Sequence, residues 1–241
     1  MNLVIDIGNS LTKVAIAEGE TIINVDKYEF LSTEVIDKTI SKYSPDKAII
    51  SNVGKIDKEV ASHLISIIPT IEFNSLTKIP ITNNYKTPQT LGLDRIALVV
   101  GANYLYPSTN LLVIGCGTAI TYDLIDNKSQ YHGGAISPGI ALRFKSLHQH
   151  TANLPLLERV DTFELIGSST SECIESGVLN GVIGEIDYYI NRIKEEFPSP
   201  MVIVTGGDVN FFVNKLKNSI FVVQNLVIIG LNRILEFNAK H

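Results

Sequence analysis

Short strand-like runs alternate with helical patterns along the whole chain, and this alternation limits the fold more than any other feature. Strands are predicted at residues 3–5, 13–17, 48–50, 111–114, 201–204 and 221–223. Helices are predicted at residues 32–43, 57–67, 94–104, 169–197 and 226–237. Alternation of this kind is typical of α/β or α+β layering, in which helices cover the faces of a sheet.

The two halves of the chain open in the same way. Residues 3–5 lead into a turn that contains Gly8 and then into a second strand. Residues 111–114 lead into a turn that contains Gly117 and then into a second strand. We interpret the repeat as a duplicated α/β unit with a boundary near residues 107–109, which predicts domains at residues 1–108 and 109–241.

Charge and composition argue against several classes of protein. The 241 residues carry 20 Lys+Arg and 25 Asp+Glu, a net charge of −5, which is not the basic surface of a nucleic-acid-binding protein. No apolar run reaches the roughly 18 residues of a membrane span, and the first residues do not resemble a signal peptide. Cys116 and Cys173 form no CxxC pair, so we expect reduced thiols in a cytosolic protein.

A carboxylate and a glycine turn follow the first predicted strand, in residues 6–13. The backbone N–H groups of such a turn can bind phosphate oxygens. The carboxylate of Asp6 can hold Mg²⁺, directly or through water. A plain hairpin with an Asx turn is an equally good interpretation of the same residues.

Gly92, Leu93, Asp94 and Arg95 stand at the start of a predicted helix, after a polar stretch that contains Tyr85. Asp94 is suited either to cap this helix or to act as a general base. In the second interpretation, Arg95 binds an anion.

Three further glycine segments, residues 115–119, 133–139 and 205–208, each end a strand or begin a helix. The first places Thr118 beside Gly117 and would suit a phosphate contact, although a simple turn is as good an interpretation. Ser169 and Glu172 form a capping box for the long helix at residues 169–197. The apolar face of that helix indicates either a dimer contact or core packing.

Taken in this order, residues 6–10, 92–95, 117–121, 133–139 and 205–208 resemble the signature set of the type III pantothenate kinases. The resemblance covers essentially the whole chain. It implies two ribonuclease-H-like domains, a duplicated actin-like ATPase unit, flanking a nucleotide cleft. It also implies ATP-dependent phosphorylation of the 4′-hydroxyl of pantothenate, the first step of coenzyme A synthesis, by a cytoplasmic homodimer. Such enzymes need Mg²⁺ and usually a monovalent cation, K⁺ or NH₄⁺.

The resemblance also implies roles for individual residues. Asp6 would position Mg²⁺, and the residues that contact ATP would be Asp6, Gly8, Asn9, Ser10, Thr12, Lys13 and Thr118. The residues that contact pantothenate would be Tyr85, Gly92, Leu93, Asp94, Arg95 and Thr170. Asp94 would accept the proton of the substrate hydroxyl.

One position departs from the family pattern. The family usually has an Asp two residues before the Gly-Thr pair, and that Asp binds the monovalent cation, whereas this chain has Gly115. Our hypothesis is that the cation site is lost or is rebuilt from backbone carbonyls. Three rival functions stay open: a kinase for another small alcohol, a nucleotide-binding regulator without turnover, and a structural α/β partner protein.

Overall fold

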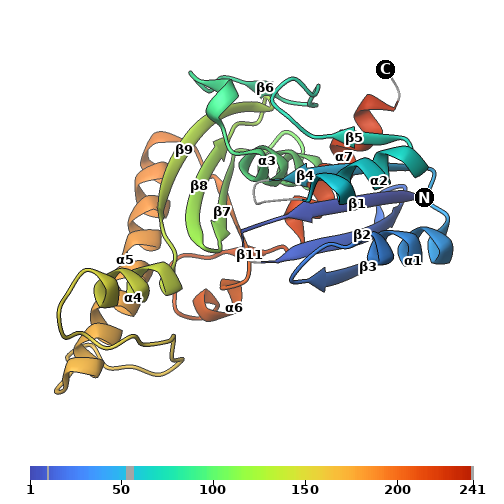
Figure 1. Cartoon of the computed structure of the whole chain (residues 1–241). Helices are drawn as coiled ribbons and strands as arrows, with labels where there is room; N and C mark the ends of the chain where they lie inside the picture. Colours follow the sequence, from blue (N-terminus) through green and yellow to red (C-terminus); the bar gives the residue numbers. More distant parts are fainter. Residues whose placement is uncertain (10, 53–56, 240–241) are drawn as a thin grey trace. The chain divides into compact units, whose positions relative to one another are not determined.

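The computed structural model describes residues 1–9, 11–52 and 57–239, and Figure 1 shows its elements in chain order. The chain divides into two compact units. Unit 1 comprises residues 1–108, 128–132 and 225–241, and unit 2 comprises residues 109–127 and 133–224. Strands and helices alternate in both units, so the predicted α/β class is confirmed.

Unit 1 is built on a five-stranded mixed sheet with the order β3-β2-β1-β4-β5. Its strands are β1 (Asn2–Ile7), β2 (Thr12–Glu18), β3 (Thr21–Tyr28), β4 (Lys47–Asn52) and β5 (Thr70–Glu72). The predicted hairpin is confirmed, because β1 pairs with β2 in antiparallel register, whereas β4 runs parallel to β1. The sequence did not predict β3, whose residues are exposed or half-buried and lack a continuous apolar run.

Helices cover both faces of this sheet. On one face, α1 (Thr33–Tyr43) and α2 (Lys58–Ile67) enclose a core that includes Leu3, Ile5, Ile36 and Leu64. The other face contacts α3 (Leu93–Leu105) and α7 (Leu226–Asn238), which also pack against each other (Figure 1). The face of the sheet under α3 and α7 is the one that carries the candidate site described below.

The position of α7 differs from the predicted division of the chain. The sequence-based boundary assigns α7 to residues 109–241, but α7 packs within unit 1. The reason is its long apolar surface, which is buried against α3 and the sheet. Residues 128–132 also group with unit 1, since β6 (Thr82–Asn83) pairs there with the start of β9 (Gln130–Pro138).

Unit 2 contains most of a six-stranded sheet with the order β11-β10-β7-β8-β9-β6. Its remaining strands are β7 (Leu111–Cys116), β8 (Ala119–Ile125), β10 (Met201–Thr205) and β11 (Phe221–Val222). The predicted strand, glycine turn and second strand are confirmed as β7 and β8, which pair in antiparallel register. β10 runs parallel to β7, so the carboxyl ends of these two strands meet at one edge of the sheet.

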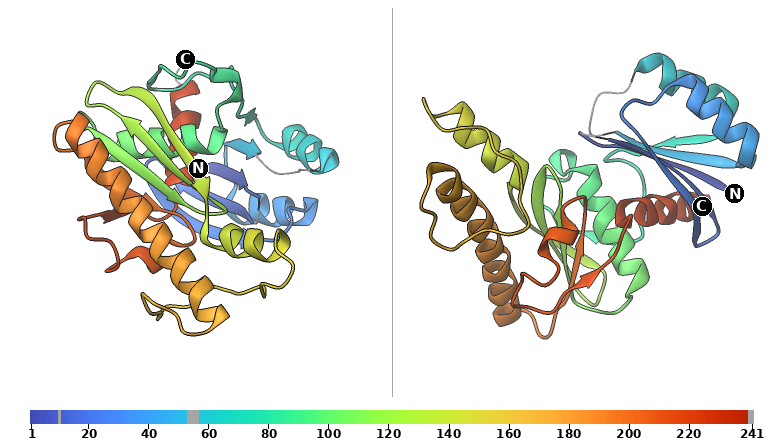
Figure 2. Two further views of the ribbon diagram at one scale, coloured as in Figure 1. Left: turned by 90° about the vertical axis from the view of Figure 1, so that its left-hand side faces the viewer. Right: turned by 90° about the horizontal axis from the view of Figure 1, so that it is seen from below.

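A single long helix covers much of this second sheet. α5 (Thr170–Glu196) begins with the predicted capping box of Ser169 and Glu172 and runs along one face of the strands (Figure 2). The predicted apolar face is buried and packs against β7, β8, α4 (Ile140–Gln149) and α6 (Val209–Phe212).

A short 3₁₀ helix, η1 (Pro88–Thr90), precedes α3. Within the part of the chain that the structure describes, no helix has the length and apolarity that a membrane crossing requires.

We predict that Gly230→Ala destabilises the protein by about 1–3 kcal/mol or more. A Cβ atom at Gly230 would lie 1.8 Å from the carbonyl oxygen of Ala97, so α7 would have to move away from α3. Urea unfolding measures the change. The matched control is Gly184→Ala in α5, where a Cβ meets nothing within 4 Å and where we expect a gain of up to about 1 kcal/mol from helix propensity. Equal stability of the two variants would contradict the close helix contact.

Candidate active site

Asp6 is a nearly buried carboxylate at the end of β1, with 9% of its surface exposed. It lies in register with Lys13 on β2 and with Ser51 on β4. Residues in register on neighbouring strands point to the same face of a sheet. The three side chains therefore share one face, opposite the face that packs on α1 and α2.

The electrostatics of this group are unfavourable without a further cation. Burial raises the pKa of Asp6 to about 6, Lys13 opposes that rise, and the nearby carboxylate of Asp94 adds to it. Burial also lowers the pKa of Lys13, which Asp6 counteracts. Of the two charges that act on Asp6, the half-buried Lys13 attracts its carboxylate and Asp94 repels it.

These residues fit Mg²⁺ when its other ligands come from a substrate. The hydroxyl of Ser51 is fully buried beside Asp6 and has no hydrogen-bond partner, so it is free to bind a water molecule or a ligand. Over residues 1–9, 11–52 and 57–239, no cluster of three His, Cys, Asp or Glu side chains could hold a metal ion. Mg²⁺ commonly binds one or two carboxylates together with waters and substrate phosphates, and Asp6 matches that pattern.

A backbone donor that was expected to bind phosphate, the N–H of Gly8, is already used within the protein. The N–H of Gly8 donates to the carbonyl of Leu11 at 3.1 Å, which closes the hairpin and occupies this donor. Thr12 is buried at the start of β2, and Asn9 is exposed. The predicted contact at Ser10 lies outside the described residues.

Asp94 does not cap α3, so that interpretation is wrong. The helix starts at Leu93 after the N-cap Gly92, and Asp94 lies in its first turn, where its Oδ1 accepts a hydrogen bond from the N–H of Arg95 at 2.9 Å. A Cβ at Gly92 would lie 2.6 Å from that oxygen, so the glycine makes room for the carboxylate. Leu93 is half-buried beside it.

Arg95 and Tyr85 come together beside this carboxylate. Arg95 is only 4% exposed, and its guanidinium carbon lies 5.7 Å from the centre of the Tyr85 ring. Tyr85 in turn stacks on the buried ring of Tyr131, with 6.2 Å between centroids. Unit 1 thus gathers the residues predicted to contact pantothenate, except Thr170. The sequence analysis missed Tyr131 and Ser51, for which neither spacing nor a motif gave a signal.

In unit 2, the three predicted glycine segments meet at one edge of the sheet. Gly206 has φ of 110°, and a Cβ there would lie 2.1 Å from the carbonyl oxygen of Cys116. A Cβ at Gly139 would lie 2.1 Å from the carbonyl oxygen of Gly117. The exposed turn of Gly117 and Thr118 is therefore held between the ends of β9 and β10.

Three ionisable side chains lie at this edge: Asp208, Arg159 and Cys116. Asp208 forms an ion pair with Arg159 at 2.6 Å; burial raises the pKa of Asp208 and Arg159 opposes the rise. Burial, with a smaller contribution from Asp208, raises the pKa of Cys116 to about 12, so this thiol is protonated at neutral pH. Cys116 is a small buried side chain.

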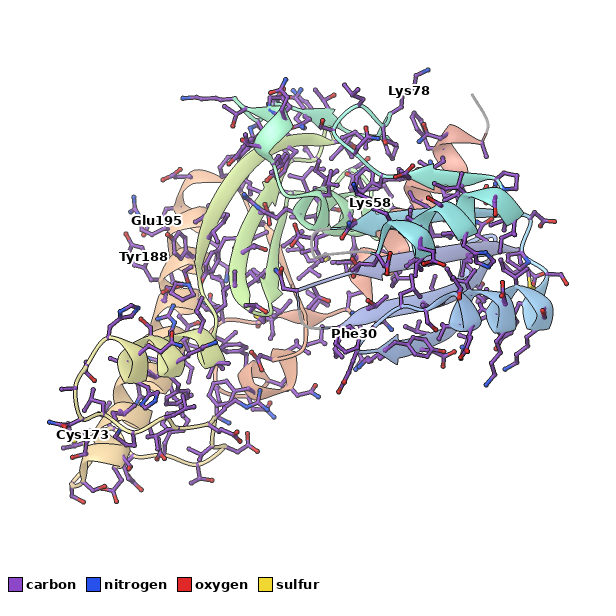
Figure 3. The ribbon with its side chains drawn as sticks, in the orientation of Figure 1. Phe30, Lys58, Lys78, Cys173, Tyr188 and Glu195 are labelled. Carbon is purple, nitrogen blue, oxygen red and sulfur yellow. The ribbon has the colours of Figure 1, made fainter. Side chains whose placement is uncertain are left out.

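Thr170, the first residue of α5, lines an open pocket of about 880 Å³ in unit 2. Arg143 and both Ser168 and Ser169 supply polar groups, and apolar side chains supply much of the remaining surface. Cys173 lies at this end of α5 (Figure 3). The pocket has the mixed character of a site for a small polar molecule with an apolar body.

Comparison with known proteins gives a consistent result. Residues 2–192 match the family model described as Type III pantothenate kinase. The chain is 42% identical over 242 residues to the type III pantothenate kinase of Phocaeicola vulgatus, with 100% of both proteins covered. It is 41% identical over 239 residues to that of Bacteroides fragilis, with 99% of this chain and 98% of the relative covered.

A solved structure extends the comparison of the fold. The activator of the 2-hydroxyisocaproyl-CoA dehydratase from Clostridium difficile, with bound ADPNP, superposes with a TM-score of 0.55 at 13% identity. The match covers 100% of this chain and 97% of that one. At that identity the likeness shows the fold alone, and it confirms the predicted actin-like ATPase fold.

We predict that Asp6→Asn stabilises the ligand-free protein at pH 8 but not at pH 4. The raised pKa means that the ionised form is disfavoured in the folded state, so the destabilisation is absent below the unfolded pKa of 3.8 and complete above about 6. The difference between these values corresponds to at most about 3 kcal/mol. Thermal unfolding at several pH values measures it, with the exposed Glu29→Gln as control. A lower Tm for Asp6→Asn at pH 8 would contradict the unfavourable burial of this charge.

Proposed function

The chain belongs to the type III pantothenate kinase family, and we propose how its two units contribute to the phosphorylation of pantothenate by ATP. This reaction lies in coenzyme A biosynthesis. The observation that carries the proposal is the group of Asp6, Lys13 and Asp94 in unit 1, where the buried carboxylate of Asp6 interacts with the half-buried side chains of Lys13 and Asp94. Such a group favours binding of a cation together with anionic phosphates.

Asp94 is proposed as the general base. The 4′-oxygen of pantothenate attacks the γ-phosphorus, the bond from that phosphorus to the ADP oxygen breaks, and the hydroxyl proton passes to Asp94. Phosphoryl transfer has a loose transition state, so the protein contributes mainly by positioning groups and neutralising charge. Gly92 leaves room for the Asp94 carboxylate, and the N–H of Arg95 fixes one of its oxygens.

Asp6 is proposed to hold Mg²⁺, directly or through water, with Ser51 as a neighbouring hydrogen-bonding group. When bound, Mg²⁺ neutralises charge on the phosphates of ATP. Lys13 adds a second positive charge at the same face of the sheet. Asn9 and Thr12 remain proposed ATP contacts of the same turn.

Arg95 and Tyr85 are proposed to bind pantothenate. Arg95 can pair with the substrate carboxylate, and its contact with the Tyr85 ring limits the rotation of the guanidinium. Leu93 offers apolar surface next to Asp94. Thr170 is proposed to contact pantothenate from the pocket at the start of α5.

In unit 2, the turn of Gly117 and Thr118 is proposed to bind the phosphates of ATP. Both residues are exposed, and the turn follows a buried strand. The C. difficile structure of the same fold is described with bound ADPNP, which supports a nucleotide site in this fold.

The chain is proposed to act as a homodimer in the cytoplasm. One face of α5 is buried in unit 2, which accounts for core packing, but Tyr188 on this helix is 60% exposed (Figure 3). The exposed surface of α5 is our candidate for the dimer contact.

ADP formation with Mg-ATP, measured with and without pantothenate, tests the proposed function. ADP that depends on pantothenate supports it. ADP formed only with another alcohol, or nucleotide binding without turnover, would contradict it in favour of a different kinase or of a regulator.

We predict that Asp94→Asn lowers kcat about 10²–10⁴-fold and leaves the affinity for ATP nearly unchanged. The amide keeps the shape of the side chain but cannot accept the hydroxyl proton. Steady-state kinetics with each substrate varied in turn measure both effects. An unchanged kcat would remove Asp94 from the role of base.

We predict weak or no activation by K⁺, because Gly115 offers no side-chain ligand where the family usually has an Asp. Rates in K⁺ are compared with rates in a large organic cation at the same ionic strength. Strong activation by K⁺ would show that the site has been rebuilt from other groups and would overturn the idea of a lost site.

A further inference from the structure

We propose that Glu185 of α5 is a positioning residue for the turn of Gly117 and Thr118. The proposal rests on the assignment of that turn to the phosphates of ATP. Glu185 is 15 residues beyond the start of α5 and no sequence motif singles it out. Its side chain is 24% exposed and lies against the strands of unit 2.

The carboxylate of Glu185 accepts hydrogen bonds from three different elements. The hydroxyl of Tyr122 on β8 donates at 2.8 Å, and Nη2 of Arg143 on α4 donates at 2.6 Å. The hydroxyl of Ser137 on β9 donates to the same oxygen as Tyr122. One carboxylate thus connects α5 with β8, the strand that follows the turn, with β9, whose end packs against the turn, and with α4.

The contacts continue from Arg143 to the corner between β9 and α4. Its Nε donates to the carbonyl of Pro138 at 2.8 Å, and its Nη2 also donates to the hydroxyl of Ser137 at 3.0 Å. The next residue, Gly139, donates its N–H to the carbonyl of Thr118 at 2.9 Å. The corner between β9 and α4 therefore contacts the turn directly through a backbone hydrogen bond.

The fit at this corner leaves little room for movement. A Cβ at Gly139 would lie 2.1 Å from the carbonyl oxygen of Gly117 and 2.7 Å from that of Thr118. On the other side of the turn, Tyr122 is 2% exposed and stacks on Tyr189, with 4.1 Å between ring centroids. Because β8, which follows the turn, and the corner that contacts the turn both bind Glu185, loss of its charge weakens both contacts at once.

The charge state of Glu185 agrees with this arrangement. Burial acts to raise its pKa, but the hydrogen bonds from Ser137, Arg143 and Tyr122 outweigh burial and hold the pKa below the ordinary value. The carboxylate is therefore ionised at neutral pH, and Arg143 is its counter-ion.

Glu185→Gln tests the proposal because it keeps the size of the side chain and removes the charge. We expect a loss of about tenfold to hundredfold in affinity for Mg-ATP and for a non-hydrolysable ATP analogue, since a hydrogen bond to a charged group is lost. We expect the KM for pantothenate to stay within about twofold. A merely structural defect would lower the active fraction, and so kcat, without raising the KM for ATP selectively.

Three further variants make the test specific. Tyr122→Phe removes one donor and should weaken ATP binding less than Glu185→Gln does. Glu185→Gln combined with Arg143→Met removes both charges, so it should recover stability without recovering affinity for ATP. Glu195→Gln, on the same helix (Figure 3), breaks an exposed pair with Arg192 and should leave both KM values unchanged.

The two readouts separate this proposal from the proposed function. Wild-type turnover with pantothenate tests the function, whereas affinity for the ATP analogue, measured by calorimetry, tests the role of Glu185 without turnover. A Glu185→Gln protein that is folded and binds the analogue as tightly as the wild type would overturn the proposal. Full recovery of ATP affinity in the double variant would also overturn it.

Discussion

The burial of Asp6 at the end of β1 is the constraint on which the candidate site in unit 1 depends. A carboxylate that is 9% exposed is tolerated only if positive charge lies close by, and Lys13 supplies part of it from the paired strand. Asp94 adds a second negative charge. The negative charge of Asp6 is thus incompletely compensated in the folded unit, and a metal ion, bound together with phosphates, would offset it.

The charged side chains of this site are held in place by strand pairing and by helix packing. The pairing of β1 with β2 and β4 fixes Asp6, Lys13 and Ser51 on one face. The contact of α3 with α7 fixes the helix whose first turn carries Asp94, and it is so close that Gly230 leaves no room for a methyl group. At Asp6, the proposed function requires a buried charge that is incompletely compensated and therefore lowers stability. The contact between α3 and α7 buries no such charge, so there the packing that stabilises the protein also positions Asp94.

Unit 2 positions its turn by a different means. The turn of Gly117 and Thr118 carries no charge, and its shape comes from close backbone contacts at Gly139 and Gly206. Glu185 adds hydrogen bonds from side chains on β8, β9 and α4, which lie around the turn. If the turn binds phosphates as proposed, it depends on such support, because groups that bind a ligand act best when they are oriented before the ligand arrives.

The sequence by itself determined the order of the main strands and helices, both hairpins, the capping box of α5 and its buried face. These features follow from local periodicity and from caps within a few residues of each other. It also placed the glycine segments at strand ends. It did not predict β3, whose mixed polar residues give no periodic signal. It also left open whether Asp94 caps α3, a role that the structure excludes.

Only the tertiary structure decided which of these segments meet. It brought α7 into unit 1, placed Ser51 beside Asp6 and stacked Tyr131 on Tyr85. It also joined Tyr122, Ser137 and Arg143 at one carboxylate of α5. Such contacts join residues that are tens of positions apart, and their partners are set by sheet register and helix packing, which no local pattern of residues encodes.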